Sequence, residues 1–234
     1  MNSTTFNRII HLEHPSVKQV LDIAEEIIDS NKILNIDILY KTAKKFLKLP
    51  RKGLLEIIQY LINKKILVDG SKQTKKTVLF NIYRKKIYNA IKENNGLKFS
   101  SIRKKIFTKN AGSSGQLIWH LEVLLKFGYL KKINIGKFTI FLPIDMEDEL
   151  GKLHFFLKNK LNRKIIEILN NHDKIKKSDI HKYLEDKREN VYYRLNVLSE
   201  NNIIQTKENQ SNELYLSQQI RNNVNLIIKK KSLN

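Results

Sequence analysis

Basic and amide side chains gather at two places in the chain, each just ahead of a helical pattern. The first group is Lys109, Asn110, Ser113, Ser114 and Gln116, interleaved with Gly112 and Gly115. The second group is Lys187, Arg188, Asn190, Tyr192 and Arg194. Asn and Gln amides can pair with adenine through two hydrogen bonds, whereas Lys, Arg and Ser bind phosphate oxygens. Both groups therefore predict contact with nucleic acid, with an ordinary turn and helix cap as the alternative for the first.

The net charge points in the same direction. Lys and Arg total 44 against 23 Asp and Glu, which gives a formal net charge of +21. Residues 82–143 carry +11 of this excess, compared with +6 for residues 1–81 and +4 for residues 144–234. A strong excess of one sign attracts polyanions. We therefore expect the middle segment to be the main DNA contact, and a basic surface produced by compositional bias is the alternative.

Further cations of the middle segment are candidates for phosphate contacts because almost no acids separate them. They are Lys98, Arg103, Lys104 and Lys105 before the candidate reading helix, and Lys131, Lys132 and Lys137 after it. His120 is also counted as a candidate DNA contact, with packing against the neighbouring helix as the favoured alternative.

The elements that would position these residues follow from an internal repeat. Three segments share apolar intervals of four, three and six residues: Leu54/Ile58/Leu61/Leu67, Leu117/Leu121/Leu124/Leu130 and Val191/Leu195/Leu198/Ile204. The first three positions of each set lie on one stripe of a helix. Asp37, Ser100 and Ser178 precede three shorter apolar patterns and are of the residue types that cap helices. Three copies in the same order indicate three related units.

Each unit is predicted to contain a first helix (15–30, 80–94 or 150–171), a short second helix, a third helix and a β-hairpin. The expected hairpin strands are 66–69 and 77–82, 130–135 and 137–142, and 203–207 and 213–217. This order is that of a winged helix. We expect a mainly α fold with small β-hairpin wings, built from three tandem winged helix-turn-helix units. The predicted ranges are 1–81, 82–143 and 144–217, followed by a basic helix or tail over 218–234.

Residues 84–217 resemble the archaeal tandem winged-helix transcription regulators, whose modules are related to the arsenic-repressor and MarR-like superfamilies. The residues that carry the resemblance are Gly115–Leu124, then Gly128-Tyr129-Leu130, and the strand ending Phe141-Leu142-Pro143. The segment Asn190–Leu195 repeats the pattern, with Arg194 where His120 stands and Asn202 in place of the glycine. The resemblance implies DNA binding by the third helix and the wing of each module.

The N-terminal unit differs at the start of its third helix. Pro50-Arg51-Lys52-Gly53 is followed at once by Leu54, Leu55, Glu56, Ile57 and Ile58. Such an apolar helix favours packing on protein, so we expect dimerisation or docking there, with DNA contact as the alternative.

Several function classes are disfavoured. The chain contains no cysteine, which excludes disulfides and thiolate metal sites. No phosphate-binding loop is present, and His11 and His14 lack further metal ligands, so we expect no enzyme activity and no cofactor. No apolar run is long enough for a membrane span, and we expect a cytoplasmic, nucleoid-associated protein.

The sequence thus predicts a DNA-binding transcription regulator with double-stranded DNA as its partner and a homodimer formed through the N-terminal unit. Two alternatives remain open. One is an assembly scaffold of tandem winged helices that binds no DNA, as in ESCRT-II subunits, and the other is a general transcription-machinery factor.

Overall fold

The computed structural model describes residues 10–30, 32–107, 114–207 and 212–232, and in these it is mainly helical with two small antiparallel sheets. Internal contacts divide the chain into two compact units. Unit 1 comprises residues 1–89 and 103–131, and unit 2 comprises residues 90–102 and 132–234. The division does not follow the boundaries of the sequence repeat, because it falls within the middle segment.

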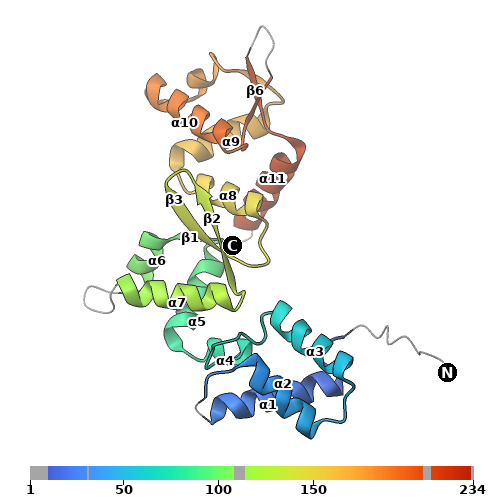
Figure 1. Cartoon of the computed structure of the whole chain (residues 1–234). Helices are drawn as coiled ribbons and strands as arrows, with labels where there is room; N and C mark the ends of the chain where they lie inside the picture. Colours follow the sequence, from blue (N-terminus) through green and yellow to red (C-terminus); the bar gives the residue numbers. More distant parts are fainter. Residues whose placement is uncertain (1–9, 31, 108–113, 208–211, 233–234) are drawn as a thin grey trace, which may run out of the picture. The chain divides into compact units, whose positions relative to one another are not determined.

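Unit 1 begins with three helices, α1 (Pro15–Asp29), α2 (Ile36–Phe46) and α3 (Arg51–Asn63), which pack on one another (Figure 1). Proline at the first position of α1 suits a helix start, because its missing N–H would have no partner there. The Asn35 side chain caps α2 by accepting a hydrogen bond from the Ile38 N–H at 3.0 Å. A continuous apolar core fills the space between the three helices.

The hairpin predicted over residues 66–82 is absent, and this prediction was wrong. Residues 66–69 form no strand, and Lys75–Val78 is a short helix, α4. Thr74 and Thr77 form a capping box, in which the Thr77 hydroxyl accepts from the Thr74 N–H at 3.1 Å. The Gly70 N–H donates to the Leu34 carbonyl at 2.9 Å, so turn contacts replace a strand pairing. Residues 1–81 therefore contain the helices of the predicted unit without its wing.

The middle segment contains α5 (Ile82–Glu93), β1 (Leu97–Lys98), α6 (Phe99–Ile106), α7 (Ser114–Lys126), β2 (Leu130–Ile135) and β3 (Phe138–Pro143). The predicted hairpin is confirmed here, with Gly136 at its tip in the left-handed region at φ 54°. Strand β1 pairs with β3 in the register Leu97↔Phe141, so the sheet has the order β1-β3-β2. The unit boundary falls within α5 and α6.

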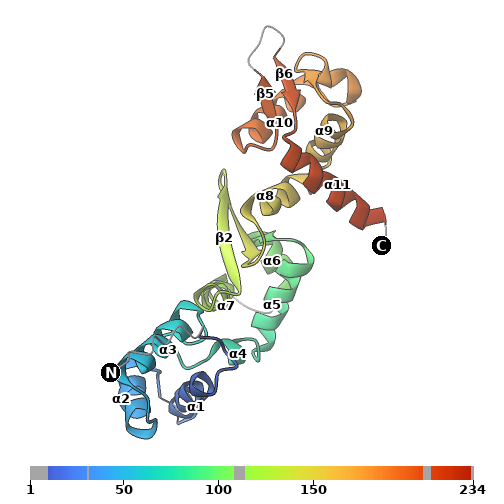
Figure 2. The same ribbon diagram turned by 90° about the vertical axis from the view of Figure 1, so that its right-hand side faces the viewer.

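Unit 2 continues with α8 (Asp148–Leu157), α9 (Lys160–Asn171), β4 (Ile175–Lys176) and a 3-10 helix, η1 (Ile180–Tyr183). It ends with α10 (Arg188–Glu200), β5 (Gln205–Lys207), β6 (Glu213–Tyr215) and α11 (Gln218–Ser232). The second sheet has the order β4-β6-β5, the same arrangement as the first. Figure 2 shows α9 beside α10, close to the β5–β6 hairpin.

Two further predictions were wrong: the single helix over residues 150–171, and the positions of three helix caps. The single helix expected over 150–171 is divided into α8 and α9, because the Asn159 side chain caps a new helix by accepting from the Asn162 N–H at 3.0 Å. The expected caps at Asp37, Ser100 and Ser178 are displaced by one or two residues: Asn35 caps α2, Ser100 lies inside α6, and Asp179 precedes η1. Short polar residues adjacent to each other compete for the capping position, and the sequence pattern does not rank them.

The apolar repeat itself is confirmed. Every member of its three sets is buried, so the stripes on α3, α7 and α10 face the interior. Gly128 and Asn202, which follow α7 and α10 at equivalent positions, both adopt left-handed backbone conformations at φ 64° and 59°. Asn is the residue that tolerates this region best after Gly, which explains the replacement.

The core of unit 2 joins the β2–β3 hairpin to the helices that follow it. Ile133, Ile140 and Leu142 belong to one buried cluster with residues of α8, α9, α10 and α11. Gly151 of α8 allows the close approach, because a Cβ atom there would lie 2.4 Å from Leu142 Cδ1. The wing of the middle segment and the last segment are thus packed as one body.

Among the described helices, none combines the length and the apolar character that crossing a membrane requires.

Candidate nucleic-acid interface

Helix α10 places a polar, basic and aromatic face outward. Val191, Leu195 and Leu198 anchor the helix in the core of unit 2. Because an α-helix has 3.6 residues per turn, the residues between these anchors face solvent. The outward face begins with Arg188 and Asn190, which are exposed in the first turn. An exposed first turn in this position of a helix-turn-helix is where base-contacting residues lie.

Tyr192 lies between two cations on this face. The Arg188 guanidinium carbon is 5.3 Å from the centre of the Tyr192 ring, and an Arg188 Nη2–H donates to the Tyr192 hydroxyl at 3.4 Å. Lys177, which follows β4, places its Nζ 5.8 Å from the same ring centre and donates to Asn196 Oδ1 at 3.3 Å. Cation–π contacts hold both cations near the ring while leaving their charge available to an anion.

Neither cation of this group has an acidic partner. Among the described residues, ion pairs are formed by Lys18 with Glu13, Lys174 with Glu213, Lys182 with Asp179, and Arg221 with Asp173, but not by Arg188 or Lys177. Glu189, the next residue in the chain, is exposed and forms no ion pair with Arg188. The arrangement around Tyr192 can bind a phosphate at no cost in broken ion pairs.

The other predicted contacts of the last segment lie nearby. Lys187 is the N-cap residue of α10 and is exposed. The Arg194 guanidinium lies 5.4 Å from the centre of the Tyr193 ring, on the side of α10 that borders a groove.

Three of the four predicted lysines of the β1–β3 sheet and its hairpin tip belong to unit 2 as well. Lys98 and Lys137 place their Nζ atoms 5.3 Å and 5.8 Å from the centre of the Phe138 ring, at the tip of the hairpin. Lys132 is exposed on β2. Lys131, one residue earlier, is partly buried and belongs to unit 1.

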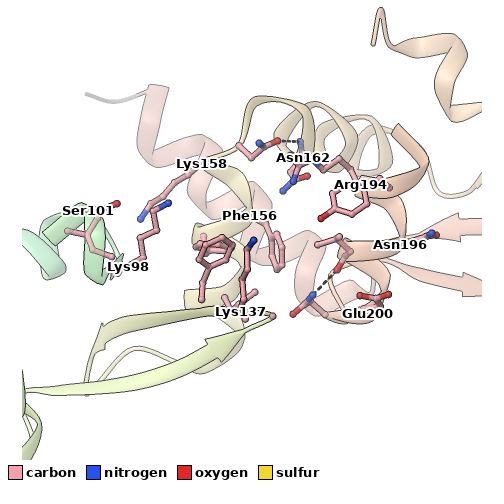
Figure 3. Close-up of a pocket in the computed structure, with 18 residues that line it drawn as sticks. Lys98, Ser101, Lys137, Phe156, Lys158, Asn162, Arg194, Asn196 and Glu200 are labelled. Carbon is pink, nitrogen blue, oxygen red and sulfur yellow. Dashed lines mark hydrogen bonds between the residues drawn. The ribbon is translucent and has the colours of Figure 1, made fainter. Parts of the chain in front are cut away.

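Three predicted contacts from distant parts of the sequence line one groove in unit 2. Lys98, Lys137 and Arg194 border a cavity of about 810 Å³, and Figure 3 shows the Lys98 side at the opposite end from Arg194. Lys158 lies beside Lys98 in this view and donates to the Gly96 carbonyl. The groove continues toward the first turn of α10, where Asn190 and Arg194 border a second hollow with Lys160 and Lys164.

Helix α7 exposes a different surface. Ser114 is its first residue and Gln116 is exposed in its first turn. The next outward positions are Ile118, which is 46% exposed, and Trp119, which is 53% exposed, followed by Glu122. Exposed Ile and Trp at adjacent positions are more typical of a protein contact than of phosphate binding.

His120 does not reach the surface, which favours the packing alternative over a DNA contact. The residue is 2% exposed, and its ring stacks on Tyr83 with 5.7 Å between centroids. Burial, together with the charge of Arg84, lowers the pKa of His120 below its usual value. A buried neutral imidazole can pack but cannot bind a phosphate, which agrees with the packing alternative.

The remaining predicted residues fall into two groups. Arg103, Lys104 and Lys105 are exposed on the last turns of α6 and belong to unit 1 with α7. Lys109, Asn110 and Ser113 lie outside the described residues. The predicted contacts are therefore divided between the two units, and those brought together by contacts are the ones in unit 2.

Sequence reasoning missed Lys177, Lys158 and Asn162. Lys177 approaches Tyr192 because the residue that follows β4 lies beside α10, and no spacing rule relates the two positions. The aromatic and basic pattern of α10 did point to Tyr193 together with Tyr192 and Arg194.

Neither the models of known protein families nor the curated proteins show a significant match to this chain.

Proposed function

We propose that this protein is a DNA-binding transcription regulator built from winged helix-turn-helix modules, with α10 as its principal reading helix. The observation that carries the proposal is the exposed face of α10, where Tyr192 is flanked by Arg188 of the same helix and by Lys177, which follows β4, and neither cation has an acidic partner among the described residues. This choice of helix departs from the expectation based on charge, which favoured the middle segment.

The chain order of the last segment supports the proposal. A helix, a short strand, a short helical turn, a longer helix and a hairpin follow one another from α9 to β6, with the sheet order β4-β6-β5. In a helix-turn-helix the later helix enters the major groove with its N-terminal residues toward the bases. Arg188 and Asn190 stand in this first turn, where Arg can read guanine and Asn can read adenine.

The lysine-rich hairpin of the middle segment supplies the second contact. Lys132 and Lys137 are exposed on the β2–β3 hairpin, which shares its core with α10. Lysines on a wing bind the backbone of the adjacent duplex rather than base edges. Base reading is thus assigned to α10 and anchoring to the wing.

Binding to a random-sequence DNA duplex across a salt series tests this function. The double variant Lys177→Ala/Arg188→Ala removes two phosphate contacts, so the slope of log affinity against log salt should fall by about 1.8. The matched control is Lys182→Ala, because Lys182 is already paired with Asp179 at 2.8 Å in the same segment. Equal binding of duplex, single-stranded DNA and RNA by the natural protein would exclude the proposal.

A protein-assembly role is the second candidate, and the exposed Ile118 and Trp119 of α7 favour it. In this alternative, which covers both a scaffold and a general transcription-machinery factor, α7 docks on another protein. The double variant Ile118→Ser/Trp119→Ser would then lose a complex that the natural protein forms. Sedimentation of both proteins across a concentration series detects self-association through this surface or through the N-terminal helices.

A further inference from the structure

The groove between the β2–β3 hairpin and α10 has the size of a small-molecule site. Its walls come from β1, the hairpin tip, the end of α8, the start of α9 and the middle of α10, all within unit 2. The volume of about 810 Å³ falls within the range of about 300–1,000 Å³ that is usual for ligand sites.

The lining combines positive charge with aromatic rings. Lys98, Lys137 and Arg194 border the groove, and Glu200 is the one acidic residue among the described residues that line it. The rings of Phe138 and Phe155 lie 6.0 Å apart between centroids, and the Tyr193 ring borders the groove from α10. A ligand that suits this lining carries both a negative charge and a flat ring.

One buried polar group in the groove has no partner. Asn162 of α9 is 3% exposed, lines the groove, and its Oδ1 accepts no hydrogen bond. Figure 3 shows Asn162 on the side of the groove near Arg194, away from Lys98. Buried acceptors are nearly always paired in folded proteins, so the unpaired Oδ1 indicates a donor that is supplied by a ligand.

We propose that this groove binds an adenine nucleotide. The ring lies among Phe138, Phe155 and Tyr193, the exocyclic amino group donates to Asn162 Oδ1, and the phosphate lies against Lys98 and Lys137. Asn is the side chain that pairs with the amino edge of adenine, which is why adenine is favoured among the bases. The nucleotide is either free or part of a single strand, and binding to duplex DNA by α10 is not required.

Isothermal titration of the full chain with AMP, with ribose 5-phosphate and with a single-stranded pentamer of deoxyadenylate tests the proposal. AMP should bind with 1:1 stoichiometry, and ribose 5-phosphate, which lacks the ring, should bind at least about tenfold more weakly. Binding of the pentamer without binding of AMP would assign the nucleotide to a strand. Failure of both to bind, or equal affinity for AMP and ribose 5-phosphate, would refute the site.

Two substitutions on one hairpin provide a matched pair. Lys137→Ala removes a lining cation and should weaken nucleotide binding by about tenfold, whereas Lys132→Ala removes an exposed lysine outside the groove and should leave it unchanged. Equal effects of the two variants would show that only general charge attracts the nucleotide, and would overturn the assignment.

Asn162→Leu tests the base contact. It should abolish the preference for AMP over ribose 5-phosphate, and thermal unfolding checks that the variant folds. The DNA-contact variant Lys177→Ala/Arg188→Ala should keep natural AMP affinity, so a failure of the duplex-binding proposal and a failure of this one can be told apart.

Discussion

Helices α7 and α10 occupy equivalent places in the repeat, and their residues correspond one to one. Gln116 corresponds to Asn190, Trp119 to Tyr193, and the buried His120 to the half-buried Arg194. Both helices bury the same apolar stripe, so they are anchored in the same way. They differ in what they expose, which is apolar on α7 and basic with aromatic rings on α10.

The difference shows that the net charge of a segment does not tell which of its helices exposes basic side chains. The middle segment carries the larger charge excess, yet among its described lysines only Lys126, in the last turn, lies on α7, and the others lie on α5, on α6, on the sheet and on the hairpin. The last segment has a smaller charge excess of +4 and still presents Arg188 on α10 and Lys177 beside it, both without acidic partners in the part of the chain that the structure describes. Whether a cation on a helix faces solvent depends on its position relative to the buried apolar stripe of that helix.

The largest expected effect is the loss of stability when a buried leucine of α7 or α10 is truncated, because both helices are anchored by the same apolar stripe. Leu121→Ala and Leu195→Ala each leave a cavity in a tightly packed site and should lower the free energy of unfolding by about 3 kcal/mol. Urea unfolding followed by circular dichroism measures both. A loss below about 1 kcal/mol at one site only would show that the two helices are not held alike.

Because α7 and α10 expose different side chains, substitutions in their first turns should change the affinity for duplex DNA by different amounts. Arg188→Ala removes a contact in the first turn of α10 and should weaken duplex binding by about tenfold. Gln116→Ala on α7 should change it by less than about twofold, a change within the range of a neutral surface substitution. Fluorescence anisotropy with a labelled duplex at fixed salt compares the two. The reverse order would return the reading role to the middle segment.

The equivalent positions of α7 and α10 hold His120 and Arg194, so a pH dependence of stability is expected from α7 and not from α10. Burial, with the charge of Arg84, lowers the pKa of His120 in the folded protein. Above the unfolded pKa, about 6.5, the imidazole is neutral in both states; below it, the unfolded chain binds a proton that the folded chain resists. The free energy of unfolding should therefore fall as the pH drops below about 6.5.

The variant His120→Phe retains an aromatic ring without the titrating group. Its free energy of unfolding should fall less between pH 7.5 and pH 5.5 than that of the natural protein, as measured by urea unfolding at both pH values. An unchanged slope would show that His120 does not contribute to the acid sensitivity.

The smallest expected effects are those of substitutions at the two exposed aromatic residues, Trp119 of α7 and Tyr193 of α10. Trp119→Ser and Tyr193→Ser change exposed side chains, so each should alter the free energy of unfolding by no more than about 1 kcal/mol. Only Tyr193→Ser should weaken duplex binding, because Tyr193 supports Arg194. Equal losses of DNA affinity in the two variants would remove the contrast between the helices.

Much of the fold could be predicted from periodicity. The stripes on α3, α7 and α10 identified the buried face correctly, and the β2–β3 and β5–β6 hairpins were located by their β-branched runs. The N-terminal hairpin was wrong because Thr74 and Thr77 cap each other locally, a preference that the apolar pattern does not contain. The break between α8 and α9 depends on one cap, Asn159, inside an otherwise continuous helical pattern.

The candidate site was harder to predict than the fold. Residue type located Arg188, Asn190 and Tyr192, because basic, amide and aromatic groups on one helix are visible in the sequence. Lys177 and Asn162 were missed because their roles arise from contacts between elements that are distant along the chain. His120 was kept as a candidate DNA contact because its neighbours Trp119 and Leu121 do not reveal which side of α7 is covered by Tyr83.

The shared core of the hairpin and α10 has a consequence for the architecture of a target site. Leu142 packs against Gly151, and both belong with α10 to one packed body, so the β2–β3 hairpin and α10 cannot adjust their separation independently. A promoter recognised by both would have a fixed spacing between its two contacted stretches. Inserting about five base pairs between them turns one stretch to the opposite side of the duplex, whereas about ten restore the same side. Sensitivity to such insertions would therefore be periodic rather than graded.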